Sequence, residues 1–88
     1  MKLLFCRLCK DVAALSEAER ACRCGRSKGR YLDGNRVRVW GPAAVLGIKN
    51  LSLEAAVGRR GEKGAGKIAV DAYVFPEGWE TVSEGGEA

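Results

Sequence analysis

The sequence predicts a small, β-rich α+β domain, with antiparallel hairpins in its N-terminal part and a strand–short helix–strand extension behind them. Three observations support this prediction: four cysteines in two close pairs, a strictly alternating run around residue 38, and further short apolar runs after residue 42. With 88 residues the chain is expected to form one domain. We divide it into a cysteine-bearing part (1–41), the extension (42–76) and an acidic, flexible tail (77–88).

The first half of the chain reads as short strands joined by turns. Residues 2–5 and 11–15 are expected to be strands, and residues 16–20 a polar connection, with a short helix at 16–21 as the competing interpretation. Residues 30–32 and 36–40 flank an Asp-Gly-Asn turn, which is a hairpin signal. In the second of these runs the valines alternate with Arg36, Arg38 and Trp40, so one face should be buried and the other exposed.

The second half is expected to contain a strand, a helix and another strand. Residues 43–48 are an apolar run of strand length, and residues 51–57 place Leu53, Ala56 and Val57 on one helical face. Asn50 or Ser52 is the expected N-cap, and Gly58 the end signal. A glycine-rich basic loop (58–67) then leads into a strand at 68–75, which Pro76 ends. The loop fits G-x-x-x-x-G-K, but Ile68 stands where a phosphate-binding loop needs Ser or Thr.

Composition restricts the class and location of the protein. The hydrophobic fraction of 47% argues against a disordered chain. No apolar run approaches the roughly 18 residues of a membrane span. The apolar start is cut at Cys6 and Arg7, short of the about 7–15 residues of a signal sequence. We therefore expect a cytoplasmic protein, in which clustered thiols bind metal more often than they form disulfides.

The chain contains no histidine. This absence removes Ser-His-Asp and Cys-His nucleophile pairs and the commonest general base. The acids Asp33 and Asp71 stand isolated, and no paired-carboxylate motif occurs at a recognisable spacing. We therefore expect a protein that is not an enzyme.

The cysteines have the spacing of metal ligands. A Cys-x-x-Cys pair is followed after twelve residues by a Cys-x-Cys pair and Gly25, which can adopt the positive φ of a turn. Four thiolates fill a tetrahedral coordination sphere, so we expect one structural Zn²⁺. Iron, a redox disulfide and inert buried thiols remain as alternatives. The predicted ligands are Cys6, Cys9, Cys22 and Cys24.

The residues around the cysteines carry a resemblance to a known family. Phe-Cys-Arg-Leu-Cys-Lys and Ala-Cys-Arg-Cys-Gly-Arg, together with the run down to Asp33-Gly34, resemble small zinc-ribbon proteins with rubredoxin-type knuckles from bacterial and phage genomes. The resemblance covers residues 3–34. It implies a structural zinc site and carries no implication about activity.

Positive charge is concentrated in the cysteine-bearing part. Residues 1–41 carry ten Lys/Arg against four Asp/Glu, whereas residues 42–88 carry five against seven. Arginine forks suit phosphates, and interleaved aromatic rings can stack on bases. Alternatively, these arginines offset the −2 charge of a zinc tetrathiolate and solvate an exposed strand face. The predicted ligand-binding residues are Arg23, Arg26, Lys28, Arg30, Tyr31, Arg36 and Arg38.

These patterns lead to one expected function and two alternatives. We expect a non-enzymatic binding module whose basic face recognises a phosphate-bearing ligand, either a nucleic acid or a nucleotide. One alternative is a protein-interaction adaptor or phage-type inhibitor that docks on an acidic partner surface, or forms a homodimer, through the apolar segments 43–57 and 68–75. The other is a sponge that sequesters a nucleotide in a pocket.

Overall fold

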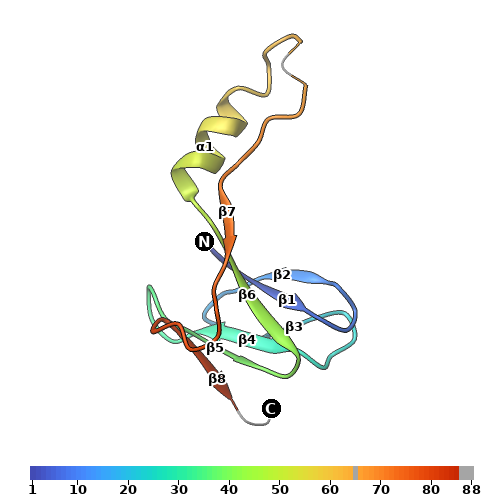
Figure 1. Ribbon diagram of the computed structural model, residues 1–88, viewed down its shortest axis with the longest axis vertical. Coiled ribbons are helices and arrows are strands. Elements are labelled where there is room, and N and C mark those ends of the chain that lie inside the picture. The colour runs from blue at the N-terminus through green and yellow to red at the C-terminus, as the bar shows by residue number, and fades with distance from the viewer. Residues whose placement is uncertain (65, 86–88) are drawn as a thin grey trace.

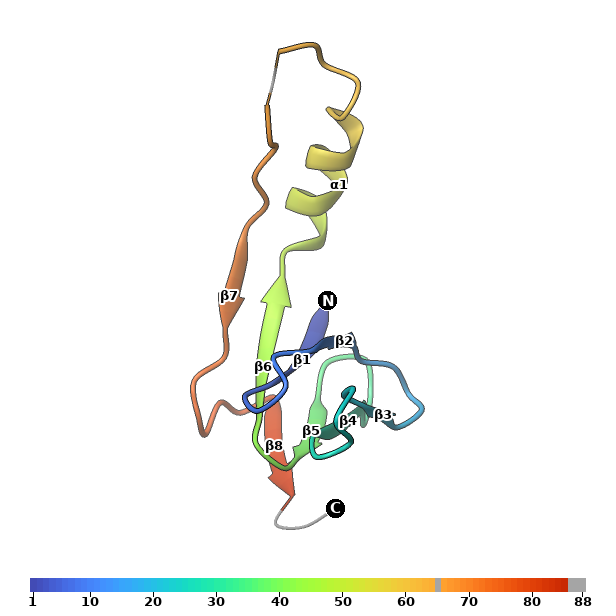
Figure 2. The ribbon, with the colours of Figure 1, turned by 90° about the vertical axis from the view of Figure 1, so that its right-hand side faces the viewer.

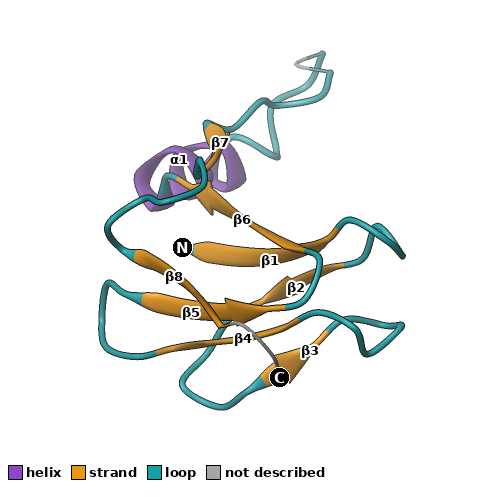
Figure 3. Cartoon of the chain, turned by 60° about the horizontal axis from the view of Figure 1, so that its bottom comes forward, coloured by secondary structure: helices purple, strands orange, loops and turns teal. Residues whose placement is uncertain are grey.

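The chain forms two four-stranded β-sheets and one short helix in the part that the computed structural model describes, residues 1–64 and 66–85. The sheets have the strand orders β2-β1-β6-β7 and β3-β4-β5-β8 (Figure 3). The small, β-rich architecture predicted from the sequence is therefore confirmed. The elements in chain order are β1 (Lys2–Cys6), β2 (Val12–Ala14), β3 (Arg20–Ala21), β4 (Lys28–Tyr31), β5 (Val37–Trp40), β6 (Ala43–Ile48), α1 (Asn50–Gly58), β7 (Ala72–Val74) and β8 (Val82–Gly85).

The first sheet is built around β1. This strand pairs antiparallel with β2 on one side and with β6 on the other, and β6 pairs antiparallel with β7. Residues alternate along β1, so that Leu4 and Cys6 are fully buried. The strands predicted over 2–5, 11–15 and 43–48 are confirmed, and the structure has a loop rather than a helix before β3.

The second sheet contains the hairpin predicted from the Asp-Gly-Asn turn. β4 and β5 pair antiparallel, and Val37 and Val39 are buried, as the alternation requires. The Asp33 carboxylate closes the turn by accepting the backbone N–H groups of Asn35 and Arg36 at 2.9 Å and Arg36 Nε at 2.7 Å. These hydrogen bonds, the one from Asn35 first, lower the pKa of Asp33 to about 2.

The hydrophobic core lies between the two sheets. It joins Leu4 and Val45 of the first sheet to Val37 and Val39 of the second, and Ala13 and Leu15 complete it. Half-buried Tyr31, Phe75 and Val82 pack against its edge. Because residues from both predicted parts form this core, the extension is packed directly on the cysteine-bearing part.

The helix projects away from this body. β6 continues past the sheet into α1, and the chain returns beside the helix to β7, which stretches the molecule to 48 Å against 26 and 23 Å in the other directions (Figures 1 and 2). We call α1 and residues 66–71 the arm. The arm buries Ala56, whereas Leu51 is 81% exposed and Val57 45% exposed. The apolar helical face predicted from the sequence is therefore only partly covered.

Two predictions in this region are wrong. The last predicted strand spans Ala72–Val74 rather than 68–75, because its partner β6 ends at Ile48 opposite Ala72 and offers no further ladder. Neither Asn50 nor Ser52 caps the helix, since the N-cap is Lys49 without a side-chain hydrogen bond. Asn50 Oδ1 instead accepts the Met1 amino group at 3.0 Å, and Ser52 Oγ accepts the Asp71 N–H at 2.8 Å.

The predicted flexible tail is also corrected for part of its length. Residues 82–85 form β8, which runs parallel to β5 with Val82 opposite Val37 and Gly85 opposite Trp40. The open edge of β5 gives this short segment a ladder of backbone partners, which its acidic composition does not reveal. Residues 86–88 lie outside the described residues.

Candidate metal centre

The first cysteine pair lies in a tight turn at the end of β1. The Cys6 N–H donates to Asp11 O at 3.0 Å, and the Lys10 N–H donates back to Cys6 O at 2.9 Å. Lys10 is the one non-glycine residue of the described chain with a positive φ, at 63°. This left-handed residue turns the chain out of the first cysteine loop and back into β2.

The second pair lies in the loop between β3 and β4. The Cys22 N–H donates to Ser27 O at 2.9 Å, and the Gly25 N–H donates to Cys22 O at 3.0 Å. Gly25 has φ 77°, the left-handed conformation that the sequence suggested for it. The Arg23 N–H donates to Asp11 Oδ2 at 2.8 Å and so ties this loop to the first.

The β5–β6 turn holds both cysteine loops in place. Gly41 has φ 83° and passes so close to the Arg26 backbone that a side chain at this position would collide with it. On the other side, the Arg7 N–H donates to Pro42 O at 2.8 Å. Sequence inspection identified these two residues only as the end of a strand, because their second role depends on contacts with distant segments.

The loops bring all four sulfur atoms together. The Sγ atoms lie within 4.8 Å of one another, with 3.7 Å between Cys6 and Cys24 and 3.4 Å between Cys22 and Cys24. All four cysteines are free, since a disulfide needs about 2.05 Å between sulfurs. Four sulfurs about 2.3 Å from one ion would lie about 3.8 Å apart, so this cluster fits a single metal ion.

The buried hydroxyl of Ser27 lies beside the cluster. Its Oγ is enclosed and makes no hydrogen bond with any atom of the described residues. Its proximity is nevertheless the largest influence that lowers the pKa of the Cys6 thiol to about 6, ahead of the Cys9 backbone N–H. The approach of Ser27 to Cys6 is therefore an electrostatic contact, because a formed hydrogen bond needs tighter geometry.

The cysteines compete for negative charge. At Cys24 the Arg26 backbone N–H favours the thiolate, but the sulfur of Cys22 and burial outweigh it and raise the pKa to about 11. The Ser27 N–H donates to Cys22 Sγ at 3.4 Å and supports a thiolate there. A cation at the centre would stabilise all four thiolates at once, which is the chemistry of a metal ligand set.

Three of the predicted ligand-binding residues come together on the solvent side of the second sheet. Lys28 and Arg30 of β4 lie opposite Trp40 and Arg38 of β5, respectively, on the face that points away from the buried valines. We call Lys28, Arg30, Arg38 and Trp40 the outer face. The Arg38 guanidinium lies over the Trp40 ring, 5.5 Å from its centroid.

The remaining predicted residues lie elsewhere. Tyr31 is half-buried on the opposite face, where its hydroxyl accepts the Lys2 N–H at 2.9 Å. Arg36 is engaged with Asp33 in the hairpin turn, and exposed Arg23 and Arg26 belong to the second cysteine loop. The sequence could have separated Tyr31 from the outer face, since residues 30 and 31 of one strand point to opposite sides.

The outer face carries uncompensated charge. Within residues 1–64 and 66–85 the ion pairs join Arg36 to Asp33 and Arg59 to Glu62. Lys28, Arg30 and Arg38 therefore have no acidic partner in the described part of the chain.

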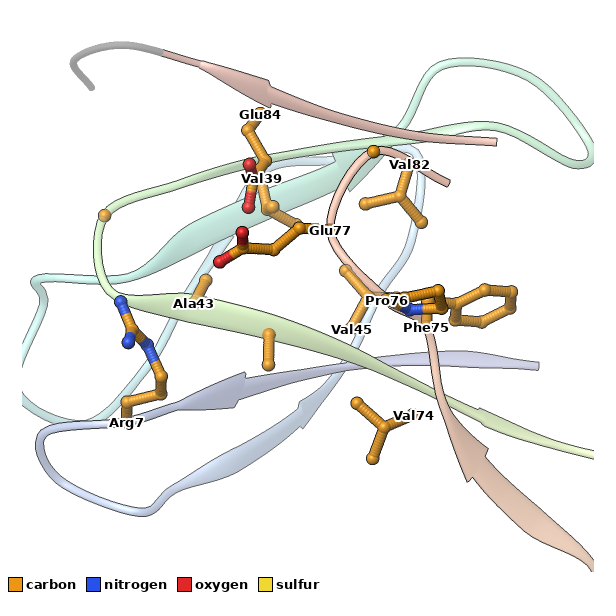
Figure 4. Close-up of a pocket in the computed structure, with 13 residues that line it drawn as sticks. Arg7, Val39, Ala43, Val45, Val74, Phe75, Pro76, Glu77, Val82 and Glu84 are labelled. Carbon is orange, nitrogen blue, oxygen red and sulfur yellow. The ribbon is translucent and has the colours of Figure 1, made fainter. Parts of the chain in front are cut away.

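A cavity of about 290 Å³ lies between the sheets, beside the first cysteine loop. Figure 4 shows Val39, Ala43 and Val45 at its base and the carboxylates of Glu77 and Glu84 reaching into it, with Arg7 at one side. Sequence inspection missed these acids because both fell in the expected flexible tail, 77–88. The cavity extends the core towards solvent next to the cysteine cluster.

In the residues that the structure describes, no helix has the length and apolar character needed to cross a membrane. Comparison with protein-family models, with curated proteins and with solved structures finds nothing that matches this chain.

Proposed function

We propose that the cysteine cluster holds one structural Zn²⁺ in a zinc-ribbon arrangement. The proposal is supported by four convergent sulfurs and by two tight loops that each turn at a left-handed residue, Lys10 and Gly25. When bound, the ion would neutralise thiolate charge and cross-link the two loops. Four sulfur ligands leave no open coordination position, so the site serves folding rather than catalysis.

The function that this scaffold supports best is non-catalytic binding of a nucleic acid through the outer face. The observation that carries it is the cross-strand pair Arg30↔Arg38, two like charges directly opposite each other. Such pairs destabilise a sheet unless an anion lies between them. A phosphate could bridge the two guanidinium groups with paired hydrogen bonds. Binding would then remove the repulsion between the two arginines, which favours the bound state.

Trp40 supports the outer face from within the sheet. Its indole lies across Gly85 of β8, where any larger side chain would collide with the ring, and the Arg38 guanidinium lies over the same ring. The indole therefore holds Arg38 beside Arg30 rather than offering a free stacking face. Lys28, Arg30 and Arg38 spread positive charge over two neighbouring strands, which suits successive phosphates of one strand, so the proposed ligand is a phosphodiester chain rather than an isolated phosphate.

Fluorescence anisotropy with labelled single-stranded RNA and DNA tests this function. The affinity should fall linearly on a log–log salt plot, and Arg38→Gln should reduce the slope by about 0.7 for single strands. Lys49→Gln, at an exposed position between β6 and α1, is the matched control and should leave the slope unchanged. Absence of binding at 50 mM salt, or equal slopes for the two variants, rejects the proposal.

Native mass spectrometry of protein purified from its own host tests the metal. We expect one zinc ion per chain. A red, redox-active protein with one iron would retain the four-cysteine site but reject zinc as its metal.

The arm favours a second candidate function, docking on a partner protein. Leu51 is 81% exposed and Val74, at the base of the arm, is 64% exposed, so apolar side chains face solvent over a projecting element. Photo-crosslinking from Leu51, combined with sedimentation analysis, distinguishes a self-associating arm from a monomeric one. A monomer with no stoichiometric cross-linked partner counts against this candidate.

A further inference from the structure

A second cavity, distinct from the outer face, is lined by aromatic side chains. It has a volume of about 270 Å³ and lies between the β4–β5 turn and residues 73–81. Four of the six aromatic residues of the chain line it: Tyr31, Tyr73, Phe75 and Trp79. Tyr73, Phe75 and Trp79 come from one segment and Tyr31 comes from β4, so only the fold completes the set. We call this cavity the aromatic pocket.

The rings are arranged as a packed wall with exposed faces. Tyr73 meets Phe75 edge-on with centroids 5.2 Å apart, and Phe75 meets Trp79 at 6.0 Å. Phe75 is half-buried against the core, whereas Tyr73 is 44% exposed and Trp79 is 46% exposed. The two outer rings therefore have free surface on which a flat ligand can stack.

A buried ammonium group completes the aromatic pocket. Lys2 is only 8% exposed, and its Nζ lies 5.3 Å from the centroid of the Phe75 ring. Nζ donates to the backbone O of Asn35, with Asn35 Oδ1 a further 3.4 Å contact. An ammonium has three N–H groups, and the two hydrogen-bond acceptors that Nζ has among the described residues are both atoms of Asn35. One donor is therefore left for a ligand.

The charge of Lys2 decides which ligands the aromatic pocket can take. Aromatic cages normally bind cations through the faces of their rings. Here a cation of the protein already occupies that position, so a second cation would be repelled. A suitable ligand is flat, for stacking on Tyr73 and Trp79, and carries an oxygen that accepts from Lys2 Nζ. Asn35 Oδ1 is directed towards Lys2 Nζ, so the amide nitrogen of Asn35 is left to donate a hydrogen bond to the ligand.

We propose that the aromatic pocket binds one unstacked nucleobase with a keto oxygen, such as uracil, thymine or guanine. The volume is at the low end for ligand cavities, which suits one base rather than a longer segment. Adenine carries an amino donor in place of a keto oxygen, so it could meet the Lys2 donor only through a ring nitrogen and is expected to fit less well. This inference deepens the proposed function and rests on it for the source of the base, a strand whose phosphates contact the outer face.

The two tryptophans of the chain make the two sites separately observable. Trp79 lines the aromatic pocket and Trp40 belongs to the outer face, so each site has its own indole N–H signal in a ¹H–¹⁵N spectrum. Uridine, which has no phosphate, should shift the Trp79 signal and leave Trp40 unchanged. Inorganic phosphate should shift signals of the outer face alone. Adenosine should bind about tenfold more weakly than uridine.

Matched variants assign the effect to named groups. Lys2→Met keeps the buried stem but removes the ammonium, and should weaken uridine binding about tenfold. Trp79→Leu changes a half-exposed side chain, so it gives an independent test if Lys2→Met fails to fold. Lys28→Met on the outer face is the control and should bind uridine like the native protein.

The outcomes separate this inference from the proposed function. If uridine leaves Trp79 unchanged, or if tetramethylammonium shifts it more strongly, the aromatic pocket is not a keto-base site, whatever the outer face binds. If uridine shifts the Trp79 signal while neither phosphate nor an oligonucleotide shifts the Trp40 signal, the base-binding proposal for the pocket is supported and the phosphate-binding function is rejected.

Discussion

Ser27 places a buried hydroxyl beside the cysteine cluster, where it lowers the pKa of the Cys6 thiol to about 6. The same hydroxyl would stabilise a metal-bound Cys6 thiolate by a charge-assisted contact. Ser27→Ala should therefore weaken metal binding by about 10–100-fold, as for other residues that support metal ligands, and lower the urea midpoint of the metal-loaded protein. Competition with a colorimetric chelator measures the affinity, and urea unfolding of the metal-loaded protein measures the stability.

A serine at the surface provides the control for this prediction. Ser16 is exposed and hydrogen-bonds locally to Ala18 O, so Ser16→Ala should change neither quantity. Equal metal affinities for Ser27→Ala and the native protein would show that the hydroxyl does not support the thiolate.

At the same scale, the sequence predicted the cysteine cluster but not the residues that hold it in place. Spacing identifies Cys6, Cys9, Cys22 and Cys24 because metal chemistry restricts how ligands are distributed along a chain. The roles of Ser27 and Gly41 depend on contacts between distant segments, which spacing does not encode. The wrong N-cap has a similar cause, since Asn50 and Ser52 find tertiary partners instead of helix N–H groups.

Among the elements, the β4–β5 hairpin was predictable because its turn carries its own chemistry. Asp33 closes it with local hydrogen bonds, and the alternation of Val37 and Val39 sets the buried face. β8 was not predictable, because its partner β5 lies 45 positions earlier in the chain. β7 was overestimated for the same reason, since the length of its ladder is set by where β6 ends.

The Asp33 turn makes hairpin stability depend on pH. The pKa of about 2 in the folded chain lies below the ordinary value of 3.8, so the contribution to folding is complete above that ordinary value. It should disappear as the pH falls towards 2. Carboxyl ¹³C NMR should show Asp33 titrating near 2, and Asp33→Ala should lower the urea midpoint at pH 7. A carboxyl that titrates near 3.8 would contradict the turn geometry.

For the molecule as a whole, the cysteine cluster lies where both sheets meet. Cys6 ends β1 of the first sheet, while Cys22 and Cys24 lie between β3 and β4 of the second. A structural zinc contributes about 10–16 kcal/mol in small domains, more than the about 3–5 kcal/mol expected of a core this small.

Chelation should therefore unfold at least residues 1–40. Since β6 pairs with β1 and β8 with β5, both sheets should lose order together. Circular dichroism during titration with a strong chelator measures the loss, and added zinc should reverse it. An unchanged ¹H–¹⁵N spectrum after the metal has been removed would contradict this prediction.

The position of the helix relative to the two sheets was the feature hardest to predict from the sequence. The pattern of Leu53, Ala56 and Val57 predicts a helix with one apolar face but does not say what covers that face; in the structure α1 projects from the body and buries Ala56. Whether an amphipathic segment covers its own sheet or points into solvent is decided by the direction in which the preceding strand leaves the body, here β6.

The parallel pairing of β5 with β8 has a consequence for the order of assembly. Hairpins such as β1–β2 and β4–β5 close over short loops, whereas joining Val37 to Val82 confines a long stretch of chain and costs more entropy. We expect β8 to be the last strand to dock during refolding. A ribosome that had released only the first 76 residues would thus expose a half-built second sheet with β5 as an open edge.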